Sequence, residues 1–245
     1  MPNAVLKNIP NAITCANLFS GCVGIVFAFN GDLIFAAYAV FLAALFDFFD
    51  GFAARLLNAF SNIGKDLDSL ADVVSFGVLP GVMLYQLFLK ANRIEELDNW
   101  INYCAFLIPV FSALRLAKFN NDTRQTENFI GLPTPANAIL IASLPIIAKS
   151  SKGLFVNLLI NPFILLAFTI VMCALLVVDI PMLSLKFKNF DLKKNLFRYL
   201  LLLFSAFAIL FFKFAAIPLI ILIYIILSIF QFNFPNQKNG KRVLK

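Results

Sequence analysis

Four aspartates lie close together in a chain that is otherwise strongly hydrophobic: Asp47, Asp50, Asp68 and Asp72. The first two are three positions apart and the last two are four apart, so each pair would share one face of a helix. A carboxylate near the centre of a bilayer costs roughly 2.5 to 3.5 kcal/mol unless it is paired or bound to a cation. Because four carboxylates would also repel one another, we expect divalent metal ions between them. The alternative is a purely structural cluster of charges.

The two pairs end one apolar run and begin the next, on either side of a short polar connector. If those runs are antiparallel helices, the pairs face each other and form a volume suited to one or two hard, oxygen-seeking cations. Two metal ions about 4 Å apart would clamp a phosphoryl group during an in-line displacement. The pattern therefore predicts metal-assisted phosphoryl transfer.

Residues around the pairs suit that chemistry. The guanidinium fork of Arg55 matches phosphate oxygens, although an arginine at this place could simply be a cytoplasmic positive charge. Gly51 and Gly64 would let a ligand approach the backbone, or could be packing glycines. Ser61 offers a hydroxyl to a phosphate or a sugar. Asp66 lies on a different helix face from Asp68, and we expect it to be a solvated connector charge.

The composition indicates a membrane protein. The chain is 61% hydrophobic and only 13% charged, which is about half the charge of a soluble domain. It has no His, so the commonest general base and transition-metal ligand is missing, and its four cysteines form no close pair. Basic residues flank apolar spans instead of forming basic tracts, so nucleic acid is not an expected partner.

Hydropathy predicts an all-α integral membrane protein in which one domain covers residues 1–245. Breaks fall at Asn30-Gly31, at Pro133 and Pro135, at Asn161-Pro162 and at Pro181. The N-terminus shows no cleavable signal pattern. Each predicted segment is about long enough to cross a bilayer, though 134–149 is short. The eight segments are 13–30, 32–49, 67–89, 100–118, 134–149, 161–178, 195–212 and 214–233.

The placement of Lys and Arg predicts the orientation. With eight spans and a cytoplasmic N-terminus, fifteen of the 20 basic residues lie on the cytoplasmic side. Positive residues concentrate on that side of a membrane protein. We therefore expect both termini, the 50–66 connector and the aspartates to face the cytoplasm, in the cell (inner) membrane. The five basic residues left outside are Lys90, Arg93, Lys149, Lys152 and Lys213.

The aspartate segment resembles the signature of the CDP-alcohol phosphatidyltransferases. Written as D-x2-D-G-x2-A-R-x8-G-x3-D-x3-D, it matches that family at every fixed position from Asp47 to Asp72. The resemblance implies a bundle of the CDP-alcohol phosphotransferase type, a CDP-linked lipid donor, two divalent cations (Mg²⁺ or Mn²⁺) and an acceptor alcohol. It also implies a homodimer.

The resemblance assigns roles residue by residue. Asp47 and Asp68 would bridge both metals, Asp50 and Asp72 would each complete one site, and Asp72 would be the catalytic base. The segment from Pro10 to Asn17 resembles the part of the family that holds the nucleotide, although Asn11 and Thr14 could instead be ordinary helix caps. The full set expected to bind the CDP-lipid is Asn11, Thr14, Asn17, Gly51, Ala54, Arg55, Ser61 and Gly64.

A second stretch, residues 111–138, resembles that of integral-membrane phosphatidylserine synthases. It favours L-serine as the acceptor, with CDP-diacylglycerol as the donor. Charged and polar side chains there could hold the serine carboxylate, although they could equally be cytoplasmic positive charges beside a helix-breaking proline pair. The candidate serine-binding residues are Arg115, Lys118, Asn120 and Thr134.

Two other functions stay open. Enzymes that use glycerol 3-phosphate or inositol share the aspartate signature. A cation-coupled transporter would also place acids in a membrane, but its acids are expected near the midplane and often in related halves. Since no thiol or His lies near the cluster, direct attack by the acceptor is favoured, and a carboxylate intermediate is not excluded.

Overall fold

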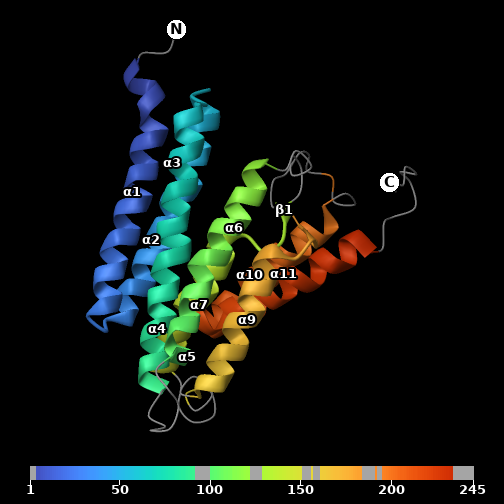
Figure 1. The fold of residues 1–245 in the computed structure, drawn as a ribbon. Coiled ribbons are helices and arrows are strands. Elements are labelled where there is room, and N and C mark those ends of the chain that lie inside the picture. The colour runs from blue at the N-terminus through green and yellow to red at the C-terminus, as the bar shows by residue number, and fades with distance from the viewer. Residues whose placement is uncertain are drawn as a thin grey trace.

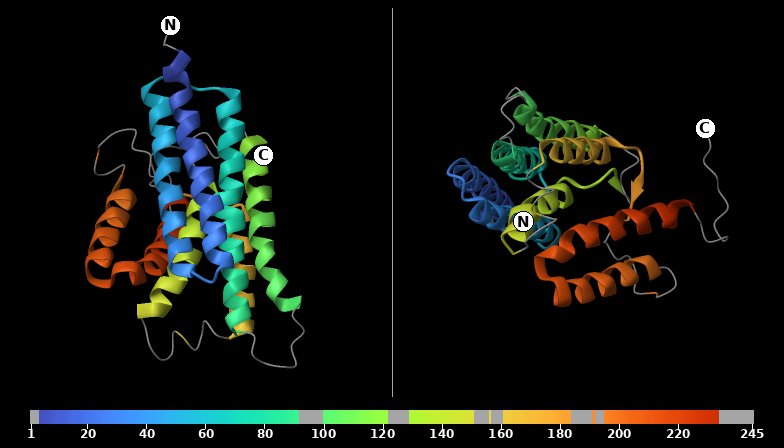
Figure 2. Two further views of the ribbon diagram at one scale, coloured as in Figure 1. Left: turned by 90° about the vertical axis from the view of Figure 1, so that its left-hand side faces the viewer. Right: turned by 90° about the horizontal axis from the view of Figure 1, so that it is seen from below.

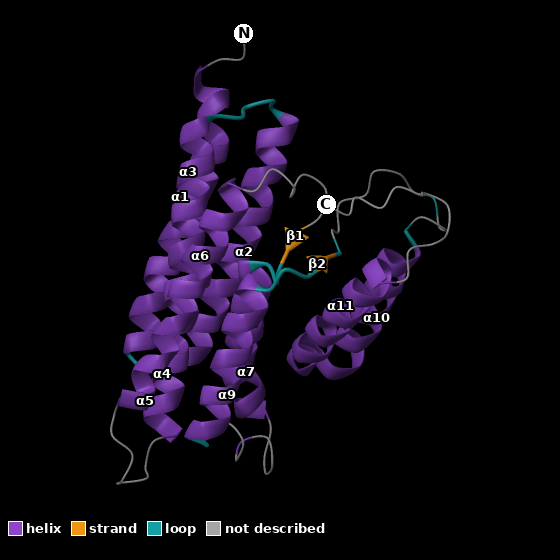
Figure 3. Cartoon of the chain, turned by 45° about the vertical axis from the view of Figure 1, so that its right-hand side comes forward, coloured by secondary structure: helices purple, strands orange, loops and turns teal. Residues whose placement is uncertain are grey.

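The computed structural model describes residues 4–91, 100–121, 129–150, 156, 161–183, 191 and 195–233. These residues are almost entirely helical, as the hydropathy predicts. Most of the helices run side by side in one bundle, and a pair of helices lies against its flank (Figures 1 and 3). Part of the predicted acceptor segment, residues 122–128, lies outside the described residues. So do several basic residues that entered the orientation prediction, among them Arg93, Lys152 and Lys186.

The first part of the bundle is a helical hairpin that continues into a third long helix. Gly31, with φ 82°, makes the turn between α1 (Ala4–Phe29) and α2 (Leu33–Leu56). The third stretch consists of α3 (Asn62–Asp72), a π-helical turn η1 (Val73–Val78) and α4 (Leu79–Ala91). The start of α1, the end of α2 and the start of α3 lie at one end of the bundle (Figure 2).

The second part completes the bundle. It contains α5 (Trp100–Tyr103), the 3₁₀ turn η2 (Cys104–Phe106), α6 (Leu107–Asn121), α7 (Thr134–Ser150) and α9 (Pro162–Val177). The predicted break at residues 161 and 162 is the start of α9. There Asn161 Oδ1 accepts hydrogen bonds from two backbone N–H groups, and proline occupies the first helical turn.

One element has no counterpart in the hydropathy pattern. Strands β1 (Phe129–Ile130) and β2 (Pro181–Met182) pair antiparallel, with Phe129 opposite Met182 and Ile130 opposite Pro181. The strands are too short to produce an alternating pattern. Together with the bond from Leu132 N to Leu175 O, this pairing ties the entry of α7 to the exit of α9.

The last two helices form a hairpin on the side of the bundle. A 3₁₀ turn, η3 (Lys213–Ala215), joins α10 (Leu196–Phe212) to α11 (Ala216–Asn233), and Lys213 adopts a positive φ of 49° there. The hairpin is inclined to the other helices (Figures 2 and 3). Its inner side packs on α7 through residues of α11, while α10 exposes large apolar side chains, as a lipid-facing helix does.

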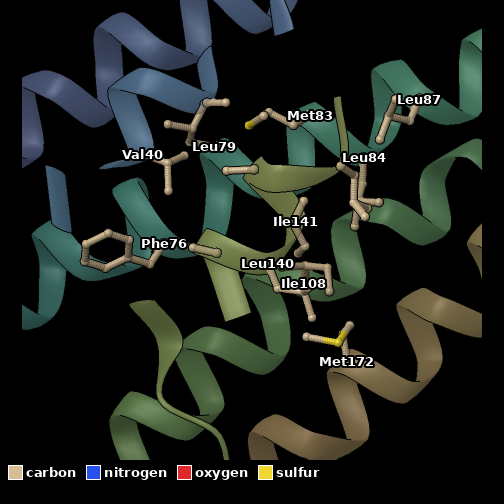
Figure 4. Close-up of a cluster of buried hydrophobic side chains, with 14 of the residues drawn as sticks. Val40, Phe76, Leu79, Met83, Leu84, Leu87, Ile108, Leu140, Ile141 and Met172 are labelled. Atoms are coloured by element: carbon tan, nitrogen blue, oxygen red, sulfur yellow. The ribbon is translucent and has the colours of Figure 1, made fainter. Parts of the chain in front are cut away.

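The core of the bundle is apolar and closely packed. Figure 4 shows side chains from α2, η1, α4, α6, α7 and α9 meeting in one cluster, with Phe76, Leu79 and Ile141 among them. Glycines bring the helices together. A Cβ at Gly24 would lie 2.8 Å from the Ala39 side chain, and one at Gly77 would lie 3.2 Å from Ser112 Cβ. Close approach of this kind is typical of membrane helix interfaces.

The chain is a multi-pass membrane protein. In the part of the chain that the structure describes, five helical stretches are long and apolar enough to cross a bilayer. All eight predicted segments coincide with helix, but eight separate spans are only partly confirmed. By length, α7 and α9 fall short, and α10 to α11 form one helical stretch, Leu196–Gln231, that folds back at Lys213.

The predicted boundaries around the aspartates were wrong. The second segment does not end near residue 49 but continues to Leu56, and the third begins at Asn62 instead of residue 67. The loop between them is therefore residues 57–61, much shorter than the predicted 50–66 connector. Alanine and leucine near Arg55 are strong helix formers, so the polar residues there do not end the helix. The motif is consequently helical almost throughout.

Candidate functional site

Three carboxylates meet where the end of α2 faces α3. One oxygen each from Asp47, Asp50 and Asp68 lies within 4.8 Å of the others. The three-residue spacing puts Asp47 and Asp50 on one face of α2, and the short loop turns the chain back so that Asp68 of α3 faces them, while α3 itself packs against α1. Asp72 follows one turn after Asp68, near enough for its charge to interact with those of Asp47 and Asp68. The predicted convergence of the aspartates is present, although the tight group does not include Asp72.

The donor set fits hard divalent cations. Asp50 is 6% exposed and Asp72 is 8% exposed. Asp68 Oδ1 and Asp72 Oδ1 are buried and have no hydrogen-bond partner among the described residues. Carboxylate oxygens that are buried, close together and unpartnered carry a large electrostatic cost unless positive charge joins them. Mg²⁺ and Mn²⁺ prefer oxygen ligands of this kind.

A pocket of about 220 Å³ opens beside the carboxylates, between α1, α2 and α3. Thr14 connects its wall to the cluster, because the Thr14 hydroxyl donates a hydrogen bond of 2.8 Å to Asp50 Oδ2. Most of the side chains predicted to bind the CDP-lipid therefore surround one space. The pocket is lined by Pro10, Asn11, Thr14, Asp50, Gly51, Ala54, Ala59, Phe60, Ser61, Gly64, Lys65 and Asp68.

Ser61 and Gly64 shape the rim of this pocket. Ser61 is the N-cap of α3, and its side-chain oxygen accepts a 2.9 Å hydrogen bond from Gly64 N. A Cβ at position 64 would lie 2.9 Å from both Asn11 Oδ1 and Ser61 Oγ, so a larger residue there would have to displace these side chains. A Cβ at Gly51 would contact nothing within 4 Å. The two glycines of the motif thus differ: one packs against protein and the other borders open space.

Two residues of the predicted donor set do not line the pocket. Arg55 lies on the last turn of α2 and is exposed. Asn17 is fully buried, and neither polar atom of its side-chain amide has a partner in the described structure. The alternative role of Asn11 and Thr14 as helix caps was wrong, because α1 begins at Ala4 and both residues lie within it.

On the other side of Asp72, α6 and α7 bring together two of the predicted serine-binding residues. Arg115 is 6% exposed, and its Nη1 donates a long hydrogen bond of 3.5 Å to the buried hydroxyl of Thr134. Its Nε has no partner among the described residues. The guanidinium also interacts with the charge of Asp72 and lies 5.9 Å from the ring centroid of Phe119. A buried cation therefore lies within electrostatic range of the buried carboxylate predicted to be the base.

The other two predicted serine-binding residues are placed differently. Lys118 is exposed near the end of α6. Asn120 faces α3, where its Nδ2 donates a 2.8 Å hydrogen bond to Ser69 Oγ. Its main-chain carbonyl accepts a hydrogen bond from Lys65 Nζ at 3.3 Å. Asn120 thus joins the end of α6 to the helix that carries Asp68 and Asp72.

Sequence reasoning missed several polar residues of this region. Lys65, which lines the pocket, was counted only as a cytoplasmic positive charge. Ser112 and Asn137 are fully buried with unpartnered polar side-chain atoms in the described structure. Their positions carry a signal that could have found them, since Ser112 lies one turn before Arg115 and Asn137 one turn after Thr134. The π-helical turn directly after Asp72 had no such signal, although turns of this kind are frequent at functional sites.

The comparison with protein families gives one match. A family model described as CDP-alcohol phosphatidyltransferase matches residues 7–179. The match covers α1 to α9 and therefore every site residue discussed above, whereas the hairpin of α10 and α11 lies beyond it.

Curated relatives are similar over slightly more than half of the chain. A CDP-diacylglycerol–serine O-phosphatidyltransferase of Helicobacter pylori strain J99 is 36% identical over 143 residues, which is 58% of this chain and 58% of that protein. A protein of the same name from Bacillus subtilis strain 168 is 36% identical over 130 residues, 53% of this chain and 71% of that protein. An archaetidylserine synthase of Methanothermobacter thermautotrophicus is 36% identical over 137 residues, 55% of this chain and 56% of that protein. The chain thus spans less than two thirds of the length of the first of these relatives.

Proposed function

The chain belongs to the CDP-alcohol phosphatidyltransferase family, and on this premise we propose that it transfers a phosphatidyl group from CDP-diacylglycerol to the hydroxyl of L-serine. The products are phosphatidylserine and CMP. One observation carries the proposal: three aspartates that match the family signature converge, and two of them, Asp50 and Asp68, border a pocket lined by the neighbouring matched residues. The names of the similar proteins support serine as the acceptor.

Asp47, Asp50 and Asp68 would hold two divalent cations together with Asp72. Bound cations would supply positive charge to the diphosphate and to the departing CMP. The chain itself would hold the donor. Thr14 fixes Asp50 by a hydrogen bond, and the Ser61 cap sets the rim of the pocket. Gly51 leaves space against α2 for the nucleotide and its diphosphate.

The acceptor side would hold serine and remove its proton. The serine hydroxyl oxygen attacks the phosphorus that bears the diacylglycerol, the new P–O bond forms, and the P–O bond to CMP breaks. Asp72 Oδ1, which is buried without a partner in the described structure, takes the hydroxyl proton. Arg115 and Thr134 bind the serine carboxylate, since a guanidinium is the best single partner for it.

The membrane setting follows the charge distribution. We propose that the site faces the cytoplasm in the cell (inner) membrane and that both termini are cytoplasmic, because the basic residues favour that side. The donor would keep its acyl chains in the bilayer while its nucleotide occupies the pocket. Family resemblance adds a homodimer to the proposal.

Release of CMP by the purified protein tests the proposal. The protein is given CDP-diacylglycerol and Mn²⁺ or Mg²⁺, with serine, glycerol 3-phosphate or inositol as the acceptor. We expect CMP that depends on serine and disappears when a chelator is added. CMP release with glycerol 3-phosphate or inositol but not with serine would show that the acceptor is that alcohol and not serine. No metal-dependent release from folded protein would reject the transferase and favour an ion-coupled transporter.

A further inference from the structure

Lys65 is a cation in the wall of the pocket that the family signature does not include. Among the described residues that line the pocket, it is the one with a positively charged side chain. It follows Gly64 directly and lies one turn before Asp68 on α3. The pocket otherwise presents the carboxylates of Asp50 and Asp68 with neutral residues. An anionic ligand placed there would therefore meet Lys65 as its nearest protein cation within the described lining.

A closed ring of hydrogen bonds holds this part of α3 to the end of α6. Lys65 Nζ donates to the carbonyl of Asn120 at 3.3 Å, and Asn120 Nδ2 donates to Ser69 Oγ at 2.8 Å. Ser69 Oγ in turn donates to the carbonyl of Lys65 at 3.1 Å. An exposed lysine usually samples many rotamers, which costs free energy when it binds a ligand. The ring restricts that freedom: it holds the ammonium group at the carbonyl of Asn120, while the residue itself lines the pocket.

The partner that Lys65 has in this ring leaves its charge available. A main-chain carbonyl is neutral, and 3.3 Å is long beside the 2.7 to 2.9 Å of a charge-assisted hydrogen bond. An ammonium group has three donors, and the described structure uses one of them. A phosphate oxygen would be a stronger partner and would not require the ring to break. If Lys65 were only a solvated cytoplasmic lysine, its charge would be explained, but its place in the hydrogen-bonded ring and in the pocket wall would not.

We propose that Lys65 binds the diphosphate of the CDP-linked lipid, and that Ser69 and Asn120 position it for that contact. The inference rests on the proposed function, since it assigns a further residue to the donor pocket of the same site. It also gives α6 a second role: Arg115, in the second half of this helix, serves the acceptor side, and the last turn of the helix supports Lys65 on the donor side.

Nucleotide binding without turnover is the direct test. The affinity of the purified full chain for CDP and for cytidine is measured by calorimetry in the presence of Mg²⁺. We expect Lys65→Met to weaken CDP binding about tenfold and to leave cytidine binding unchanged, because only CDP carries the diphosphate. Lys65→Arg should stay within about threefold of the unmodified chain, since charge is retained. Equal CDP affinity in Lys65→Met, or an equal loss for cytidine, would overturn the inference.

Two further variants separate charge from position. Lys90→Met removes an exposed lysine from the far end of the same helical stretch, and we expect it to bind CDP as the unmodified chain does. Ser69→Ala opens the ring without removing charge, so it should raise the KM for CDP-diacylglycerol a few fold with kcat unchanged, and Ser69→Thr should restore it. If CDP affinity fell as much in Lys90→Met as in Lys65→Met, the loss would reflect the net charge of the protein and not a contact made by Lys65, and the inference would be rejected.

The outcomes separate this inference from the proposed function. Serine-dependent CMP release by the unmodified chain, combined with unchanged CDP binding in Lys65→Met, keeps the function and rejects the role of Lys65. No release with any acceptor, combined with a selective loss of CDP binding in Lys65→Met, rejects the proposed reaction and keeps a diphosphate site. Absence of CDP binding by the unmodified chain would reject both.

Discussion

The two sides of the aspartate cluster differ in how their polar groups are satisfied. In the lining of the donor pocket, Thr14 donates to Asp50 and Ser61 accepts from the backbone of α3. In the part of the chain that the structure describes, the unpartnered atoms near this pocket are Asp68 Oδ1, whose carboxylate faces those of the other aspartates, and the amide of Asn17, which lies outside the lining. On the acceptor side Ser112, Asn137 and Arg115 are buried with polar atoms that have no partner among the described residues. A buried polar group without a partner costs about 1–3 kcal/mol.

This difference teaches what each side is built to do. The hydrogen bonds of Thr14 and Ser61 hold the lining of the donor pocket in one shape, so the nucleotide of the proposed donor would meet a preformed surface. The open polar groups of the acceptor side suit a small ligand with many donors and acceptors, such as serine. Such a ligand would repay the cost of burying these groups when it binds. A substrate that lacked one of its polar groups would leave a partner unsatisfied, which is a strong source of specificity.

The largest expected effect is the loss of activity when one aspartate of the tight carboxylate group is neutralised. Asp68→Asn removes a charge from the tight carboxylate group, and we expect serine-dependent CMP release to fall by at least about 10³-fold. Asp47→Asn and Asp50→Asn should behave alike. The melting temperature should not fall, because each change relieves repulsion between carboxylates. Turnover near normal in any of these variants of the folded protein would remove that residue from the mechanism.

The next effect should fall on the acceptor side alone. Arg115→Lys keeps the charge but loses the planar fork, so we expect the KM for serine to rise about 10- to 100-fold. The KM for CDP-diacylglycerol should change less than about threefold. Initial rates measured against each substrate in turn give both values. A rise in both KM values would break the comparison, because it would mean that Arg115 serves the two sides together.

A smaller effect should follow on the donor side. Thr14→Val keeps the shape of the side chain but removes the 2.8 Å hydrogen bond to Asp50. We expect the KM for CDP-diacylglycerol to rise about 3- to 10-fold with serine KM unchanged, in line with one hydrogen bond to a charged group. The matched acceptor-side change is Asn137→Leu, for which we expect the reverse pattern. If both variants alter the same KM, the division into two sides is wrong.

The carboxylate group and the pocket lining were largely predictable because their residues are close in sequence. Asp47, Asp50 and Asp68 belong to one motif, and a single short loop is enough to bring them together. Six of the eight residues expected to bind the CDP-lipid line the pocket. Asn17 does not line the pocket, because one helix face carries both pocket and core positions: Thr14 borders the pocket, and Asn17, one turn later, is buried in the core. No periodicity tells which of these turns stays open to solvent.

The acceptor side was harder to predict because it depends on packing between distant segments. Arg115 and Thr134 come into contact only through the placement of α6 relative to α7. The hydrogen bond from Asn120 to Ser69 depends in the same way on the placement of α6 relative to α3, which no local sequence pattern predicts. The last residue of α2 and the first residue of α3 were also predicted wrongly. The polar residues there resembled a loop, but their neighbours have high helix propensity and the helices continue through them. The inclined hairpin of α10 and α11 lay beyond any motif. Its two apolar runs predicted helices without predicting where they pack.

The smallest effects should come from the two glycines of the motif. Gly64 packs against the pocket wall and Gly51 borders open space, so their variants test the two surroundings separately. Gly64→Ala would place a methyl group 2.9 Å from Ser61 Oγ and Asn11 Oδ1, so we expect a lower melting temperature and weaker CDP binding together. Gly51→Ala would place its methyl group in open space, so stability should stay the same or rise slightly. If the donor occupies that space, CDP-diacylglycerol KM still rises in Gly51→Ala. An unchanged KM in a stable Gly51→Ala protein would mean that the donor lies elsewhere in the pocket, against α1 and α3 and away from α2.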